Sequence, residues 1–138
     1  MQIASGTRRG VVAAVVLLGA AAVVRAQAPA QAQTDEYVRY DLSIPSTSTF
    51  RMTYDVSATT AGATTYRDPI KTGTVVSQVV ATDLMTGASL KVQQSAAAVT
   101  ITLARAVPPN GQGRIRIEKT VKDTRGYTVA AGTGVLTQ

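Results

Sequence analysis

From Tyr37 onward the chain alternates apolar and polar residues with a period of two, and this alternation restricts its fold more than any other feature. Successive side chains of a β-strand point to opposite faces of a sheet, so each alternating segment predicts a half-buried strand. The clearest segments are 37–44, 49–57 and 114–122. No segment after Tyr37 carries helical spacing over more than a few residues, so the sequence predicts an all-β fold. The residues expected on the buried faces are Val38, Tyr40, Leu42, Ile44, Phe50, Met52, Tyr54, Val56, Ile115, Ile117 and Val121.

Two segments depart from simple alternation. Residues 74–85 are apolar on both faces, which predicts either a central strand covered on both sides or a face used by a partner. Lys119 interrupts the inner face of the 114–122 strand, and we expect that strand to reach a rim or an edge there. Residues 97–107 predict a further strand, and residues 66–70 predict a short edge segment.

Proline and glycine mark the turns between the strands. The segment 108–113, Pro-Pro-Asn-Gly-Gln-Gly, is the strongest turn signal, and residues 123–126 predict another turn. Gly87 is expected to adopt left-handed backbone in a hairpin turn. About seven short strands joined in this way predict a β-sandwich of immunoglobulin-like or related Greek-key type, with a small open barrel as the alternative.

The first 32 residues have the pattern of an export signal. Arg8 and Arg9 precede the apolar run 11–24, which is shorter than the roughly 20 residues that span a bilayer. The run therefore predicts a signal helix rather than a membrane anchor. The Arg8–Arg9 pair leaves both the general secretory route and the twin-arginine route open.

Small residues follow the apolar run, and cleavage after either Ala26 or Ala32 fits them. We expect residues 1–32 to form the signal peptide and its cleavage region, and residues 33–138 to form the β-sandwich domain. The mature domain then has no membrane span and is secreted or periplasmic. Either cut removes three arginines and no acid, so the formal charge falls from +6 to +3.

The chain contains no His and no Cys, which excludes imidazole-based catalytic triads, Cys/His metal sites and disulfides. Asp41 and Asp55 lie on predicted solvent faces, where adjacent strands could bring them together as an acid pair or a calcium site, although nothing in the spacing requires it. We expect no catalytic, cofactor-binding or metal-binding residues.

Basic residues gather in the last third of the chain. Arg114, Arg116 and Lys122 share one face of a predicted strand, and Arg125 follows in the next turn. Such a stripe predicts contact with a polyanion or an acidic partner, or else a solvated strand face whose charges discourage aggregation. No aromatic residues interleave with it, so nucleic acid is not the expected partner.

Three segments carry a resemblance to a known group of proteins. They are Tyr40-Asp41-Leu42-Ser43-Ile44-Pro45, Phe50-Arg51-Met52-Thr53-Tyr54-Asp55-Val56-Ser57 and the segment 114–123. They resemble the N-terminal β-sandwich region of larger secreted bacterial proteins and, more distantly, that of glycyl-aminopeptidase-type metallopeptidases. The resemblance implies a sandwich fold and transfers no functional residue, because the zinc-binding His-Glu-x-x-His helix of those peptidases has no counterpart here.

The functional expectation is an exported, non-enzymatic β-sandwich module that contacts an unknown protein or cell-surface polymer. It would bind through a sheet face or through an unpaired edge left by an incomplete C-terminal strand. The alternative is the non-catalytic N-terminal portion of a larger secreted hydrolase, because in the similar proteins the strands continue beyond the end of this sequence. The reading frame downstream of Gln138 distinguishes the two.

Overall fold

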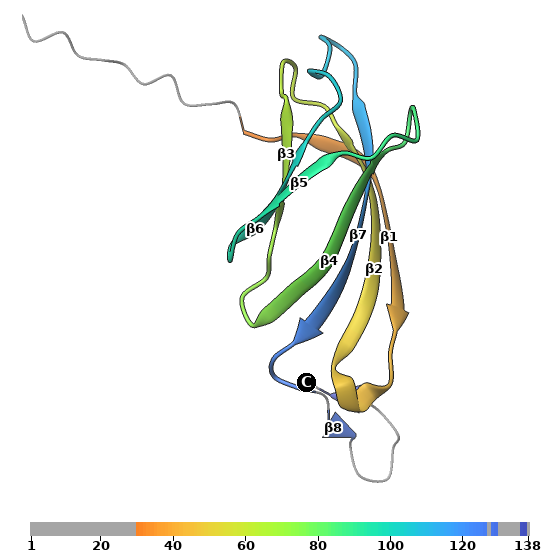
Figure 1. The fold of residues 1–138 in the computed structure, drawn as a ribbon, viewed down its shortest axis with the longest axis vertical. Helices are drawn as coiled ribbons and strands as arrows, with labels where there is room; N and C mark the ends of the chain where they lie inside the picture. The colour runs from red at the N-terminus through yellow and green to blue at the C-terminus, as the bar shows by residue number, and fades with distance from the viewer. Residues whose placement is uncertain (1–29, 127, 130–135, 138) are drawn as a thin grey trace, which may run out of the picture.

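A computed structural model of the chain describes residues 30–126, 128–129 and 136–137. The predicted signal helix lies outside the described residues. The rest is built almost entirely of antiparallel strands arranged in two facing sheets, which confirms the all-β sandwich (Figure 1).

The larger sheet has four strands and the smaller has three. The larger follows the order β1-β2-β7-β4, with bounds Gln33–Leu42, Thr49–Ala58, Gly113–Asp123 and Thr74–Asp83. The smaller follows the order β3-β6-β5, with bounds Thr65–Pro69, Ala98–Thr102 and Lys91–Gln94. A short 3-10 helix η1 (Pro45–Thr47) joins β1 to β2, and a separate ribbon pairs β8 (Thr128–Val129) with β9 (Leu136–Thr137).

The core fills the space between the two sheets. Its most deeply buried side chains come from β2, β3, β6 and β7 and include Val56, Tyr66, Val99, Ile101, Ile115 and Ile117. The inward residues predicted for β7, Ile115, Ile117 and Val121, are confirmed as buried. Tyr54 is also buried as predicted, because β2 lies in the interior of the larger sheet.

Several expectations from the sequence are wrong. Of the two alternatives for residues 74–85, the central strand is wrong, because β4 is the edge of the larger sheet and leaves Val75 and Val80 half-exposed on its outer face. A face used by a partner stays a prediction. Lys119 does not mark a rim, because β7 lies between β2 and β4 and the lysine is buried. Tyr40 is not core filler, since its side chain remains 56% exposed.

Two β-bulges adjust the alternation of the edge strands. The pairing of β1 with β2 shifts between Thr34 and Tyr37, and that of β4 with β7 shifts between Ser77 and Val80. Each bulge holds a non-glycine residue at positive φ, Asp35 at 50° and Gln78 at 52°. An extra residue of this kind reverses which side chains point inward, so the bulge in β4 produces the apparent two-faced apolar pattern of its sequence.

The predicted turns are confirmed. Gly87 has a φ of 76°, and Asn110 has a φ of 56° in the turn that follows the two prolines. Gly111 donates its amide hydrogen to the carbonyl of Pro108, and a Cβ at this glycine would lie 2.4 Å from Pro108 Cγ. The close approach of the proline ring therefore requires glycine at position 111.

Candidate functional site

The sandwich is open along one side, where strand β1 extends beyond the smaller sheet. Side chains from β3 meet β2 and β7, and they meet β1 at its first residue: Tyr66 contacts Tyr54 and Gln33, and Asp68 contacts Lys119. The inward face of β1 and of the residues after it is therefore left uncovered in part. Leu42 is 75% exposed and Ile44 is 72% exposed, although both were expected to be buried.

Two neighbouring cavities lie along this open side. One has a volume of about 470 Å³ and the other about 220 Å³, and Met52, Asp68 and Pro69 line both. The smaller cavity is mainly apolar, with Tyr40 packed edge to face on Phe50 at a centroid distance of 5.5 Å. We call these two cavities together the β1–β3 groove; its lining residues include Gln33, Glu36, Tyr40, Phe50, Met52, Tyr54, Tyr66, Asp68, Pro69, Ile70 and Lys119.

A buried ion pair forms the floor of the groove. Lys119 Nζ on β7 lies 2.5 Å from Asp68 Oδ2 on β3, so the pair links the two sheets. The lysine side chain is 5% exposed and the aspartate side chain is 9% exposed. An isolated buried charge would be very unfavourable, and the pairing explains how a lysine occupies an inward position of a core strand.

A hydrogen-bonded polar cluster closes the wider end of the groove. The hydroxyls of Tyr54 and Tyr66 lie 3.2 Å apart, and Tyr66 donates to Gln33 Oε1 at 2.5 Å. Gln33 Nε2 donates in turn to Tyr54 and to Glu36. Burial raises the pKa of both tyrosine hydroxyls above the ordinary value, so they stay neutral and serve as hydrogen-bonding groups.

The N-terminal approach to β1 protects the exposed edge of β3. Gln31 Nε2 donates to the carbonyl of Arg67 at 2.9 Å, and Arg67 donates its amide hydrogen to Gln31 Oε1 at 2.7 Å. The glutamine amide thus satisfies a backbone donor and acceptor as a neighbouring strand would. Pro69 cannot donate a ladder hydrogen bond, so the edge of β3 is blocked at two positions.

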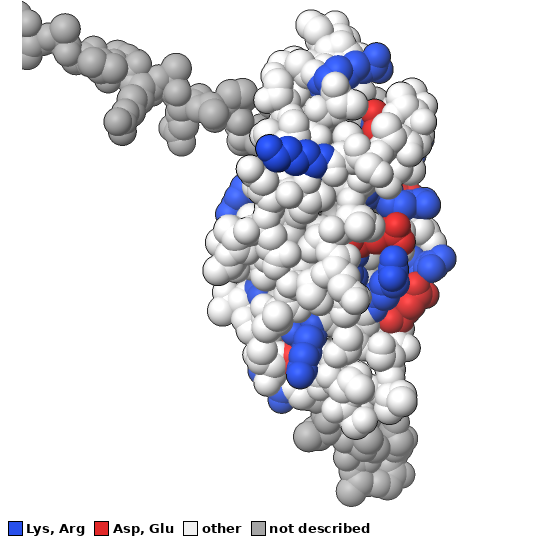
Figure 2. Space-filling view, in the orientation of Figure 1, with Lys and Arg blue, Asp and Glu red and all other residues white. Residues whose placement is uncertain are grey.

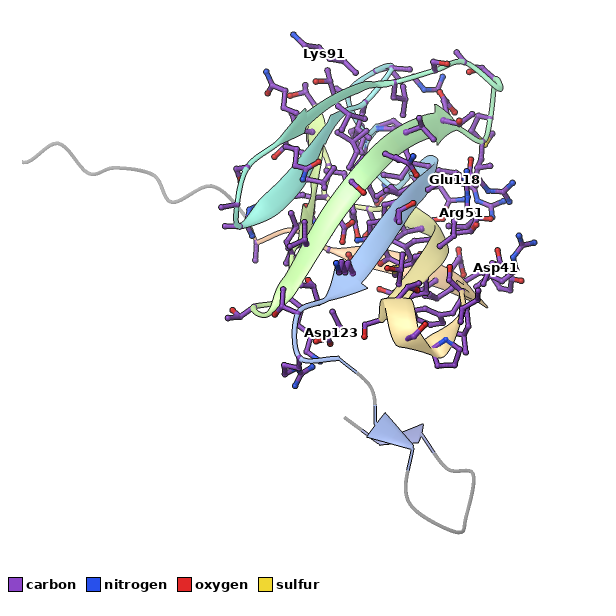
Figure 3. The ribbon with its side chains drawn as sticks, turned by 60° about the horizontal axis from the view of Figure 1, so that its bottom comes forward. Asp41, Arg51, Lys91, Glu118 and Asp123 are labelled. Carbon is purple, nitrogen blue, oxygen red and sulfur yellow. The ribbon has the colours of Figure 1, made fainter. Side chains whose placement is uncertain are left out.

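The outer face of the larger sheet carries the predicted basic stripe, interleaved with acids. Arg116 makes two hydrogen bonds of 2.7 Å to Asp55, and Arg51 pairs with Glu118 at 3.1 Å. Figure 2 shows blue and red side chains mixed along the flank formed by β1 and β2, and Figure 3 shows Arg51 and Glu118 together there. Pairing with Asp55 raises the pKa of Arg116 above its ordinary value.

The four basic residues singled out from the sequence do not form one cationic row. Arg114 and Lys122 lie near opposite ends of β7, roughly 26 Å apart at the usual strand rise. Between them stand the paired Arg116 and Glu118, and Arg125 pairs with Asp123 beyond the strand. A linear polyanion would therefore meet charges of both signs along this strand.

The two aspartates considered as an acid pair are also held apart. Asp41 accepts hydrogen bonds from Arg39, whereas Asp55 accepts its bonds from Arg116. Each carboxylate is thus neutralised by a different arginine. Within the described ranges no group of three or more acidic, histidine or cysteine side chains could hold a metal ion.

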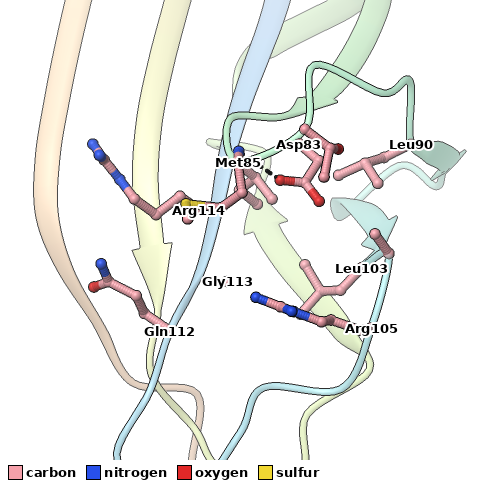
Figure 4. A pocket seen from close by; sticks show the side chains of 11 residues that line it. Asp83, Met85, Leu90, Leu103, Arg105, Gln112, Gly113 and Arg114 are labelled. Carbon is pink, nitrogen blue, oxygen red and sulfur yellow. Dashed lines mark hydrogen bonds between the residues drawn. The ribbon is translucent and has the colours of Figure 1, made fainter.

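Another cavity, of about 340 Å³, lies where β4, β7 and the segment after β6 meet (Figure 4). The side chain of Arg105 extends across it towards Gly113, whereas that of Arg114 points away from Asp83 and Leu90. Asp83 Oδ1 already accepts the amide hydrogen of Met85 at 2.7 Å. The polar groups of this cavity do not converge on a common point, so the β1–β3 groove is the stronger candidate site.

The sequence analysis did not place Asp68, Lys119 and Tyr66 in one site, although it noted that Lys119 interrupts an inner strand face. The sequence does contain a signal for this pair. Asp68 and Lys119 each occupy a strand position at which the alternation of the chain requires an apolar side chain. Two opposite charges of that kind predict a buried pair, although the distance of 51 residues between them gives no register.

In the part of the chain that the structure covers, no helix is long and apolar enough to cross a membrane. No protein-family model matches the sequence, and no curated protein matches it.

Proposed function

We propose that this chain is an exported, non-enzymatic β-sandwich module that binds a protein partner by strand addition along β1. The proposal rests on the pairing and the exposure of this strand. It is ten residues long and, among the described residues, pairs only with β2, while its inward side chains Tyr40 and Leu42 remain largely exposed. Export rests on the signal pattern of residues 1–32.

The backbone of β1 supplies the donors and acceptors that strand addition needs. An edge strand presents a row of unpaired amide and carbonyl groups, and proteins commonly block such edges with short strands, prolines or covering segments. The edge of β3 is blocked by Gln31 and Pro69, whereas β1 contains neither a proline nor a bulge between residues 37 and 42. The open edge of β1 therefore differs from the protected edge opposite it.

The β1–β3 groove supplies a place for the side chains of an added strand. A strand beside β1 would direct alternate side chains towards the inner face, next to Tyr40 and Leu42. Those residues expose apolar surface beside the apolar part of the groove around Phe50 and Ile70. Backbone hydrogen bonds and apolar contact would thus act together.

Site-specific photocrosslinking in the producing cell tests this proposal. A photoreactive phenylalanine analogue replaces Leu42 beside the β1 edge, and in a matched control it replaces Lys91, an exposed residue of β5 in the other sheet (Figure 3). We expect irradiation to give an adduct of defined mass from position 42 and none from position 91. No adduct from position 42, or the same products from both positions, refutes the proposal.

A further inference from the structure

We propose that the strand added to β1 is the β1 of a second copy of this chain, paired antiparallel about a two-fold axis at Tyr40. This inference rests on the proposed function and names the partner for it. The reason is that, over the regular part of the strand after its bulge, residues 37–42, only one antiparallel register sets the opposite charges of two copies against each other.

The direction of the backbone groups of β1 follows from its pairing with β2. Ser43, just after the strand, donates its amide hydrogen to Thr49 at 3.1 Å. Backbone groups of an antiparallel strand alternate between its two edges, so odd-numbered residues from 37 to 43 face β2. The backbone groups of Val38, Tyr40 and Leu42 consequently face the open edge.

The two faces of β1 carry different chemistry. Val38, Tyr40 and Leu42 lie on the inner face, opposite Tyr54, Met52 and Phe50 of β2. Arg39 and Asp41 lie on the outer face, pair with each other at 2.8 Å, and remain 59% and 48% exposed. This arrangement leaves one cation and one anion two residues apart beside the edge.

The charges select the register of a symmetric pair. With Tyr40 opposite Tyr40 of the second copy, Arg39 stands opposite Asp41 of the second copy, and the symmetry repeats this contact. On the inner face Val38 then stands opposite Leu42. An axis at Arg39 would place the two copies of Arg39 opposite each other, and an axis at Asp41 would do the same with the two copies of Asp41. Both arrangements are unfavourable because like charges repel.

The favoured register also suits the hydrogen-bonding pattern. Tyr40 with its counterpart, and Val38 with Leu42, would form the hydrogen-bonded pairs. Arg39 and Asp41 would occupy the intervening positions, where facing side chains approach most closely. The product is an isologous dimer in which two four-stranded sheets join into one continuous sheet. A contact of this length falls below roughly 1,200 Å² of buried surface, so we expect a weak, concentration-dependent dimer.

A charge-reversal experiment tests the register. Sedimentation velocity is measured on the full chain, purified as the cell processes it, over roughly 1 μM to 1 mM, a range that brackets weak dimers. We expect the wild type to dimerise, and R39D and D41R each to weaken dimerisation by at least about tenfold, because each places like charges opposite each other twice.

Complementation separates pairing across the interface from pairing within one chain. Neither R39D nor D41R retains the internal ion pair, yet an equimolar mixture of the two should form a heterodimer, since opposite charges then face each other across it. The double variant R39D/D41R should also dimerise. As a matched control, K122E reverses an exposed charge on the same face but on the interior strand β7, whose cross-strand neighbours there are Thr49 and Val75, and should leave dimerisation unchanged. Circular dichroism and urea midpoints establish that each variant is folded.

Each remaining outcome overturns the inference. A wild type that stays monomeric over the whole range refutes self-pairing, as does a mixture of R39D and D41R that forms no heterodimer. If the wild type is monomeric but position 42 crosslinks to a different protein, self-pairing fails and the proposed strand-addition function stands. If position 42 gives no adduct, the proposed function fails as well.

Discussion

Replacing Lys119 with methionine probes the ion pair that joins the two sheets. The substitution keeps the length of the side chain and removes its charge, which leaves the Asp68 carboxylate without its partner in a site where its side chain is 9% exposed. Removing one member of a buried pair typically costs about 3–5 kcal/mol, because the other charge stays desolvated. A domain of this size is stable by only about 5–15 kcal/mol, so Lys119→Met should consume a large part of its stability.

The double variant Asp68→Leu/Lys119→Met provides the decisive comparison. Replacing both charges with apolar side chains is commonly neutral or stabilising by about 1–4 kcal/mol, since the desolvation penalty of both ions is removed. We therefore expect the double variant to be at least as stable as the wild type. The coupling between the two substitutions should then amount to several kcal/mol, far outside additivity.

Urea denaturation followed by far-ultraviolet circular dichroism measures these free energies, because the chain contains no tryptophan to report unfolding by fluorescence. With a denaturant slope of about 1–3 kcal/mol per molar urea, Lys119→Met should lower the midpoint by at least about 1 M. Lys122→Met, an exposed lysine of the same strand, is the matched control and should change stability by less than about 0.5 kcal/mol. A loss below about 1 kcal/mol for Lys119→Met, or a double variant as unstable as the sum of the single ones, would refute the argument.

Three further predictions follow from the groove and the turns. Burial raises the pKa of the Tyr66 hydroxyl. Above about pH 10, the unfolded chain therefore loses the proton of this hydroxyl while the folded chain keeps it. The free energy of unfolding should thus fall as the pH rises above that value. Tyr66→Phe removes this hydroxyl, so between about pH 9 and pH 11 the urea midpoint of the variant should fall less than that of the wild type. An equal fall in both proteins contradicts the raised pKa of Tyr66. Cleavage after Ala26 keeps Gln31 on the edge of β3, whereas cleavage after Ala32 removes this glutamine, so the exported chain should begin directly after Ala26. The mass of its N-terminal peptide measures where it begins, and a start directly after Ala32 contradicts this prediction. Gly111→Ala should lower the free energy of unfolding, measured by urea titration, by about 1–3 kcal/mol, because the new Cβ would lie 2.4 Å from a proline ring carbon. An unchanged free energy of unfolding contradicts this prediction and would mean that the turn relaxes.

Local sequence was sufficient where burial follows simple alternation. In β7 the inward positions Ile115, Ile117 and Val121 are buried, and the glycine and proline turns lie where they were expected. These features depend on neighbours within a few residues, since side-chain period and allowed backbone angles are local properties. The same alternation correctly placed Arg114, Arg116 and Lys122 on one outer face.

The candidate site depended on register and strand order, which local sequence does not contain. The acid that neutralises Arg116 is Asp55 because the pairing of β2 with β7 sets these residues side by side. Tyr40 faces inward as its position in the alternation requires, yet it stays exposed because the smaller sheet, which meets β1 at Gln33, does not cover the later part of this strand. Burial therefore depends on what lies opposite a residue as well as on the face that it occupies.

By itself, the sequence determined the turns and, where alternation is unbroken as in residues 37–42, 49–57 and 114–122, the strands and their two faces, because backbone sterics and side-chain alternation act over a few residues. Only the tertiary structure decided that Lys119 is a core residue paired with Asp68, that β4 is an edge, and that β1 is left with an open side. Each of these depends on packing between segments distant in the chain, and the free energy of a charge or an apolar side chain depends on what that packing places around it.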